Sequence, residues 1–155
     1  MISPELLRRF PFFGVMKDEY LKMIAMHTEE VAFESGATLL SEGERAEGLY
    51  FLLDGNIDLY HTVETAYRPE LSRDFRVGEI NPGEAFGLSA CIEPRIYTAT
   101  ARAAKDSRVL KIEAAALQNI CQQDKEFAYG LMNQVANIAM QRLNSTRVQL
   151  AAAWA

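Results

Sequence analysis

The side chains best suited to catalysis or metal binding in this sequence are two histidines, His27 and His61, and two cysteines, Cys91 and Cys121. Neither histidine lies in a GxSxG, HExxH or similar motif that sets a base beside a nucleophile or a metal. The cysteines lack CxxC spacing and a nearby histidine, so they indicate neither a zinc site nor a disulfide framework. We therefore expect no catalytic residue and no metal ligand, and we interpret both cysteines as small buried hydrophobic side chains.

The charge balance restricts the class of partner. Sixteen lysines and arginines stand against 21 aspartates and glutamates, a net charge of −5, and the cationic residues form no basic stripe. Nucleic-acid binding depends on clustered cations that release counterions, so we expect no nucleic-acid partner. The sequence shows no secretory leader and no apolar run of about 18 residues, which predicts a cytoplasmic protein without a membrane span.

The 155 residues suit one domain, 1–155, in which helices flank a β-rich centre. Ser3, Pro4 and Glu5 predict a short first helix, and a second begins at Asp18 and ends near His27. Glycine-punctuated, β-prone runs then predict strands over 30–34, 38–40, 49–53, 57–62, 75–79, 98–103 and 109–112. This divides the domain into N-terminal helices (1–28), a β-barrel (29–112) and C-terminal helices (113–155).

Two further segments complete the prediction. The stretch 63–74 is polar, contains Pro69 and has no period, so we expect a loop there. After a short helix, Asp124 is suited to cap a long helix that runs to about Leu150.

The long C-terminal helix carries two apolar faces. One is expected to pack on the barrel and consists of Phe127, Leu131, Val135 and Ile138. The other follows a heptad-like spacing and consists of Met132, Ala136, Ala139, Leu143, Thr146 and Leu150. This second face predicts a homodimer through the helix, while packing in a groove of its own domain remains the alternative.

An ordered set of motifs covers most of the chain. These are FESGATL at 33–39, EG at 42–43, GLYFLLDGNI at 48–57, NPGEAFG at 81–87 and TATARA at 98–103. Together they resemble the cyclic-nucleotide-binding domain family, which includes catabolite activator protein and the regulatory subunits of cyclic-AMP-dependent kinase. The resemblance implies a mainly β fold, a double-stranded β-helix (jelly-roll) barrel with short N-terminal helices and a long C-terminal helix.

The resemblance also implies a ligand cassette, here residues 83–103. In the family, amides at a short helix start face the cyclic phosphate, a glutamate holds the ribose and an arginine pairs with the phosphate. Aligned without gaps, the glutamate position is Leu88 and the arginine position is Tyr97. The candidate ligand-binding residues are Phe86, Gly87, Leu88, Ser89, Ala90, Arg95, Tyr97, Thr98 and Thr100.

Several of these residues have a second interpretation. Pro94 and Arg95 resemble the family's Pro-Arg pair but lie two residues early, so Arg95 is either a displaced anion ligand or a solvated loop residue. Alternation along a strand predicts that Thr98 and Thr100 face away from Tyr97. Glu84 is a substitute ribose acceptor or, as we favour, a turn residue.

Loss of the phosphate's cation costs about 1.5–3 kcal/mol, or about ten- to more than a hundredfold in affinity, so binding of ordinary cyclic AMP should be weak. We predict a non-enzymatic regulatory module that binds a small-molecule ligand, either a cyclic nucleotide (cyclic AMP or cyclic GMP) or another small anion. Its signal would pass through the C-terminal helix to a separate effector protein. The alternative, favoured by Leu88 and Tyr97, is a degenerate member that binds no nucleotide and serves as a dimerisation or scaffold module.

Overall fold

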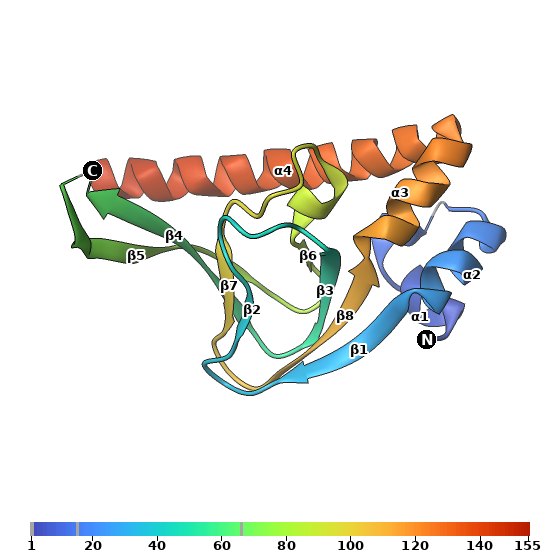
Figure 1. Cartoon of the computed structure of the whole chain (residues 1–155), viewed down its shortest axis with the longest axis horizontal. Helices are drawn as coiled ribbons and strands as arrows, with labels where there is room; N and C mark the ends of the chain where they lie inside the picture. Colours follow the sequence, from blue (N-terminus) through green and yellow to red (C-terminus); the bar gives the residue numbers. More distant parts are fainter. Residues whose placement is uncertain (1, 15, 66) are drawn as a thin grey trace.

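Two antiparallel sheets form the centre of the molecule, and a long helix runs along one side of them (Figure 1). The computed structural model describes residues 2–14, 16–65 and 67–155. One sheet has the strand order β1-β8-β3-β6, with β1 at Thr28–Phe33, β8 at Ser107–Glu113, β3 at Gly48–Asp54 and β6 at Ala85–Phe86. The other has the order β2-β7-β4-β5, with β2 at Thr38–Leu40, β7 at Thr100–Ala103, β4 at Ile57–Thr65 and β5 at Arg68–Ile80. The predicted fold class is confirmed.

Strand β3 is the centre of the hydrophobic core, and its first five residues are all buried. The ring of Phe51 contacts three aromatic rings of the N-terminal segment, with centroids 5.0 Å from Phe10, 5.3 Å from Phe12 and 5.1 Å from Phe13. These residues belong to or flank η1 (Pro11–Phe13), between helices α1 (Pro4–Arg8) and α2 (Asp18–Met26). The aromatic cluster therefore fixes the N-terminal helices on the barrel.

The predicted loop over residues 63–74 is wrong. This stretch belongs to a long hairpin in which β4 and β5 pair from Ile57 opposite Ile80 to Thr65 opposite Arg68. One face of the ribbon is polar and carries ion pairs such as that from Arg76 to Asp58, at 2.9 Å. Because β5 is an edge strand, it tolerates a proline and exposed side chains. For this reason the segment lacks the alternation of apolar and polar residues by which a strand is recognised in a sequence.

The predicted helix caps are confirmed. The Ser3 hydroxyl accepts from the amide of Glu5 at the start of α1, and the Asp124 carboxylate accepts from the amides of Glu126 and Phe127 at the start of α4. Helix α3 (Ala114–Gln123) precedes α4 (Lys125–Trp154), which extends four residues beyond the predicted end.

Helix α4 packs through one face only. Phe127, Leu131 and Val135 are buried, and Ile138 is partly buried against the core. The heptad-like face is exposed at every predicted position, Met132, Ala136, Ala139, Leu143, Thr146 and Leu150. The predicted homodimer through this face stays a prediction. Among the described residues, no helix combines the length and apolar character that crossing a membrane requires.

Candidate functional site

The cassette begins at a sharp backbone turn. The ring of Phe86 is fully buried and stacks on Tyr50, with 5.1 Å between centroids and 16° between planes. Gly87 follows with φ of +74°, and a Cβ there would lie 3.1 Å from the Gly48 carbonyl oxygen and 3.3 Å from the Tyr50 ring. Both the positive φ and the close approach require glycine, and they direct the chain into the short helix η2 (Leu88–Cys91).

Helix η2 presents little polar chemistry. Leu88, at the family's glutamate position, packs against the hydrophobic core, and Ala90 is buried. Ser89 is partly buried. The amide of Ala90 donates to the Gly87 carbonyl (3.1 Å), while the first amides of a helix have no partner within it. The cassette therefore offers backbone donors and one hydroxyl at this point, without a carboxylate.

Tyr97 is fixed to the barrel. Its hydroxyl donates to the Gly48 carbonyl (2.7 Å) and accepts from the Gly48 amide (3.2 Å), and the residue is only 6% exposed. Burial raises the pKa of the phenol, so the neutral form is favoured. In this arrangement the hydroxyl holds the end of the cassette against β3, a contact that the sequence did not indicate.

Arg95 points toward the helices. It follows a cis Glu93–Pro94 bond, has φ of +58°, and donates through a guanidinium nitrogen to Glu93 at 2.5 Å. Its side chain lines a cavity of about 240 Å³ together with η2, α3 and α4. The Nε atom is the one buried side-chain nitrogen or oxygen among the described residues that has no hydrogen-bond partner. A free buried donor of this kind is suited to an acceptor supplied from outside the chain.

The two threonines do not share one environment, so the prediction that they lie on one strand face is wrong. Strand β7 begins only at Thr100, and alternation does not extend back to Thr98. Thr98 is exposed, whereas Thr100 is 8% exposed and accepts from the amide of Glu42 at 3.0 Å. Only Thr98 presents a hydroxyl to solvent.

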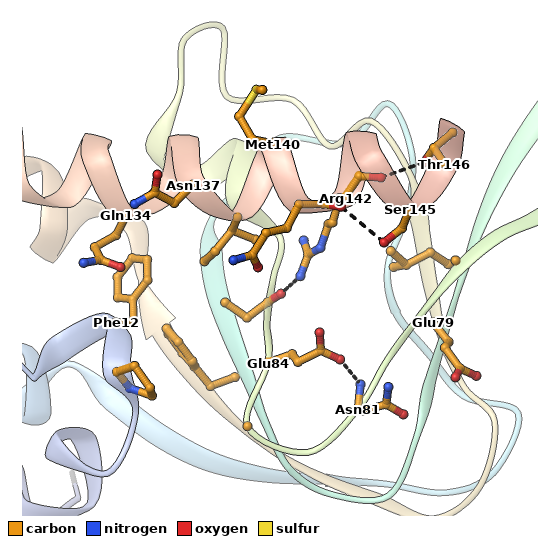
Figure 2. Close-up of a pocket in the computed structure, with 18 of the residues that line it drawn as sticks. Phe12, Glu79, Asn81, Glu84, Gln134, Asn137, Met140, Arg142, Ser145 and Thr146 are labelled. Atoms are coloured by element: carbon orange, nitrogen blue, oxygen red, sulfur yellow. Dashed lines mark hydrogen bonds between the residues drawn. The ribbon is translucent and has the colours of Figure 1, made fainter. Parts of the chain in front are cut away.

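Glu84 and Arg142 lie just ahead of the cassette. The Glu84 carboxylate accepts from the amide of Asn81 at 2.7 Å, as expected for a turn residue. The Arg142 guanidinium of α4 donates to the carbonyl of Ala85, and Glu84 is close enough to stabilise its charge (Figure 2). Sequence reasoning missed Arg142, although it is the first charged residue after Glu126 in the helix.

A large cavity separates α4 from the barrel. It is open to solvent, has a volume of about 1000 Å³, and is lined by residues 134–149 of α4, by η1, and by parts of β3, β4 and β5 with the turn before β6. Arg142 crosses it, and Gln134 points from the helix toward Phe12 (Figure 2). None of the nine candidate ligand-binding residues lines this cavity, whereas Gly83, Glu84 and Ala85 at the start of the cassette do.

The histidines and cysteines are dispersed. The Nδ1 atom of His27 lies 3.2 Å from a carboxylate oxygen of Glu113, and that of His61 lies 2.6 Å from a carboxylate oxygen of Glu42. Both histidines are on the surface. Both cysteines are free and partly buried, and desolvation raises the pKa of Cys91 to about 12. Among the described residues, no three His, Cys, Asp or Glu side chains are grouped so that they could hold a metal ion.

A two-sheet barrel, a glycine-initiated cassette between β6 and β7, and a long helix against both are the architecture of a regulatory domain. The cyclic nucleotide-binding domain model matches residues 30–124, which is more than half of the chain. The protein therefore belongs to the cyclic nucleotide-binding domain family.

Individual relatives agree with this assignment. A crystal structure of a Geobacter metallireducens GS-15 protein assigned to the cyclic nucleotide-binding proteins is 36% identical, with a TM-score of 0.79, and the match covers 92% of this chain and 99% of that one. Thermus thermophilus catabolite activator protein shares the fold at 17% identity and a TM-score of 0.67, covering 92% of this chain and 62% of that one.

Among the curated relatives, the cAMP-activated global transcriptional regulator Vfr of Pseudomonas aeruginosa is 25% identical over 125 residues. That match covers 78% of this chain and 56% of Vfr, so the chain spans about half the length of this relative.

Proposed function

We propose that this protein is a regulatory binding module that senses a small ligand at the cassette and signals through α4 to a separate effector protein. The proposal is carried by the observation that α4 contacts the cassette at two points. Arg142 donates to the carbonyl of Ala85 at its start. Further along, Leu131 and Met132 line the small cavity of Arg95. No catalytic group enters this proposal, and the cytoplasmic location stays a prediction.

The helix provides the element that a ligand can shift. A ligand changes a conformational equilibrium only through contacts that differ between two states. Beyond residue 138, α4 is exposed at every position except the partly buried Arg142. Few contacts therefore oppose a movement of this half of the helix, and a change at the cassette reaches it through the hydrogen bond to Ala85.

The chemistry of the cassette favours a small anion over an ordinary cyclic nucleotide. Leu88 has no acceptor for a ribose hydroxyl, which disfavours the sugar. The guanidinium of Arg95 keeps a free, buried Nε donor and lines a small cavity with Ala90 and Cys91 of η2. An oxyanion accepts from such a donor. Cyclic AMP and cyclic GMP remain in the test panel because the family binds them.

The test combines native mass spectrometry with a thermal-shift panel of cyclic AMP, cyclic GMP, phosphate, sulfate and small carboxylates. A ligand at one hundred times its dissociation constant adds about 2.7 kcal/mol of stability. Arg95→Gln should weaken the affinity of a bound anion at least about tenfold. Arg108→Gln removes an exposed, Glu30-paired charge and serves as the control. Equal affinities in the two variants would refute the role of Arg95.

A second candidate function is a scaffold that binds no nucleotide and assembles through α4. It is favoured by Leu88 and Tyr97, whose side chains serve packing and a backbone contact, and by the exposed Leu143 on the heptad-like face. Leu143→Glu should yield monomers in sedimentation, whereas Asn144→Glu adds the same charge beside that face and should leave the mass unchanged. If Leu143→Glu keeps the wild-type mass, the dimer interface lies elsewhere or does not exist.

A further inference from the structure

Three sulfur-bearing side chains line the small cavity beside Arg95. Cys91 is the last residue of η2, Cys121 lies in the last turn of α3, and Met132 lies in the first half of α4. Both cysteines are free, and both are partly buried against the hydrophobic core. They are also the two cysteines of the whole sequence. The fold therefore gathers every thiol of the chain, with one thioether, in a cavity of about 240 Å³.

The charge of Arg95 acts on both thiols. Desolvation raises the pKa of Cys91 to about 12 and also raises the pKa of Cys121, while the positive charge of Arg95 opposes both shifts. The Nε atom of this guanidinium is buried without a hydrogen-bond partner. A neutral thiol is only a weak acceptor, whereas a charged thiolate accepts a strong hydrogen bond from a guanidinium. The cavity thus places two thiols beside a cation that would stabilise them in their ionised form.

The donor atoms of this cavity suit a soft metal ion. Hard cations such as Mg²⁺ and Ca²⁺ take carboxylate and other oxygen ligands, and among the described residues none with a carboxylate lines the cavity. The oxygen-bearing side chains in the lining are the neutral amides of Gln118 and Gln122. A structural zinc site needs a full tetrahedral set of ligands, which two thiols do not supply. Thiolate and thioether sulfurs together select Cu(I).

We propose that Cys91, Cys121 and Met132 form a site for one Cu(I) ion, in which Arg95 balances the charge of the metal–thiolate group. On binding, both thiols release their protons to solvent and their sulfurs form bonds to the ion, which stays monovalent, so nothing is oxidised or reduced. Two thiolates and one Cu(I) carry a single negative charge. The guanidinium neutralises this charge, and its free Nε–H donates to a thiolate sulfur.

This site goes beyond the proposed anion sensing, although both use Arg95. The sequence predicted no metal ligand because the spacing of the cysteines matches no metal motif, whereas the fold brings them to one cavity from separate elements. A Cu(I) ion held by these three side chains would join η2 of the cassette to α3 and α4 at one point.

The experiment measures transfer of Cu(I) to the reduced full chain from the chelator bathocuproine disulfonate, under nitrogen. We expect one Cu(I) per chain, with a thiolate-to-copper charge-transfer absorption in the ultraviolet. Cys91→Ser and Cys121→Ser each replace a soft sulfur by a hard oxygen and should lower the Cu(I) affinity more than about a hundredfold. Arg95→Gln removes the balancing charge and should lower it about ten- to a hundredfold.

A matched pair of methionine variants tests the third ligand. Met132→Leu keeps the approximate volume and removes the thioether, so it should lower the Cu(I) affinity about tenfold. Met140→Leu makes the same change at an exposed α4 position outside this cavity and should bind Cu(I) as the wild type does. Circular dichroism shows whether each variant is folded. X-ray absorption at the copper edge of the wild-type complex needs no variant and should show sulfur as the ligand atom.

Three results would overturn the proposal. They are a wild-type protein that takes no Cu(I) from the chelator, a folded serine variant that binds Cu(I) as tightly as the wild type, and bound copper with nitrogen or oxygen ligands. The anion panel of the proposed function is measured on metal-free protein. Absence of Cu(I) binding therefore leaves that test unaffected, and absence of anion binding leaves the copper test unaffected.

Discussion

The role of Tyr97 can be tested by removing a single oxygen atom. In Tyr97→Phe the ring keeps its packing, but the hydroxyl that donates to the Gly48 carbonyl and accepts from the Gly48 amide is lost. Both bonds are buried, so water does not readily replace them. The net contribution of each is about 0.5–1.5 kcal/mol, which gives an expected loss of about 1–3 kcal/mol in the free energy of unfolding.

Urea unfolding followed by circular dichroism measures this change. The midpoint concentration should fall while the slope stays constant, because the variant exposes the same surface when it unfolds. For a chain of this size the melting temperature should fall by about 2–4 °C for each kcal/mol. Tyr129→Phe removes a hydroxyl from a side chain that is 75% exposed, and it is the matched control.

The two interpretations of Tyr97 give different results. If the hydroxyl is structural, Tyr97→Phe destabilises the protein by the same amount with and without ligand. If Tyr97→Phe unfolds like the Tyr129→Phe control but loses affinity for a bound ligand, the hydroxyl serves the ligand and our reasoning about the cassette is refuted.

Three further changes test the structure around the site. Gly87→Ala should lower the free energy of unfolding by at least about 1 kcal/mol in a urea titration, since alanine is strained at φ of +74° and its Cβ approaches the Gly48 carbonyl. An unchanged midpoint would show that a Cβ is tolerated at this position. Asp124→Ala should cost about 1 kcal/mol through the lost α4 cap, whereas Asp124→Asn, which keeps a capping oxygen, should cost less. Burial raises the pKa of Tyr50 to about 12, above its unfolded value of about 10, so this residue's contribution is complete below pH 10 and is lost between about pH 10 and 12. In Tyr50→Phe the free energy of unfolding should therefore decrease less steeply between pH 10 and 12 than in the wild type. Equal slopes against pH in the two proteins would contradict the raised pKa of Tyr50.

Local signals in the sequence were sufficient for much of the fold. Ser3 and Asp124 marked helix starts because their side chains bond to amides only two or three residues away. The Phe86–Gly87 pair marked the entry to the cassette through the family resemblance, and the positive φ of Gly87 explains why glycine stands there. Each of these signals depends on neighbours in the chain, which a sequence displays directly.

The predictions failed at residues whose contacts come from distant parts of the chain. The strand pattern of the β4–β5 hairpin was hidden because most of its described outer residues are exposed, apolar ones such as Phe75 included, and polar side chains pair on its surface, as Arg76 does with Asp58. The partner of Tyr97 is Gly48, 49 positions away, and Arg142 reaches a carbonyl 57 positions away. No spacing rule connects such positions, so neither contact could be predicted from one sequence.

The hydrogen bond from Tyr97 to Gly48 also restricts which part of the protein a bound ligand could move. Because its hydroxyl joins the end of the cassette to β3 and Leu88 packs into the core, the cassette is held in place by the protein itself. A ligand gains little by ordering a segment that is already ordered, so its effect must appear in an element held by fewer contacts. In the proposed function, the half of α4 beyond residue 138 is that element, since its residues are exposed except for the partly buried Arg142, which donates to the carbonyl of Ala85. A ligand at the cassette would therefore act on this helix through the hydrogen bond between Arg142 and Ala85.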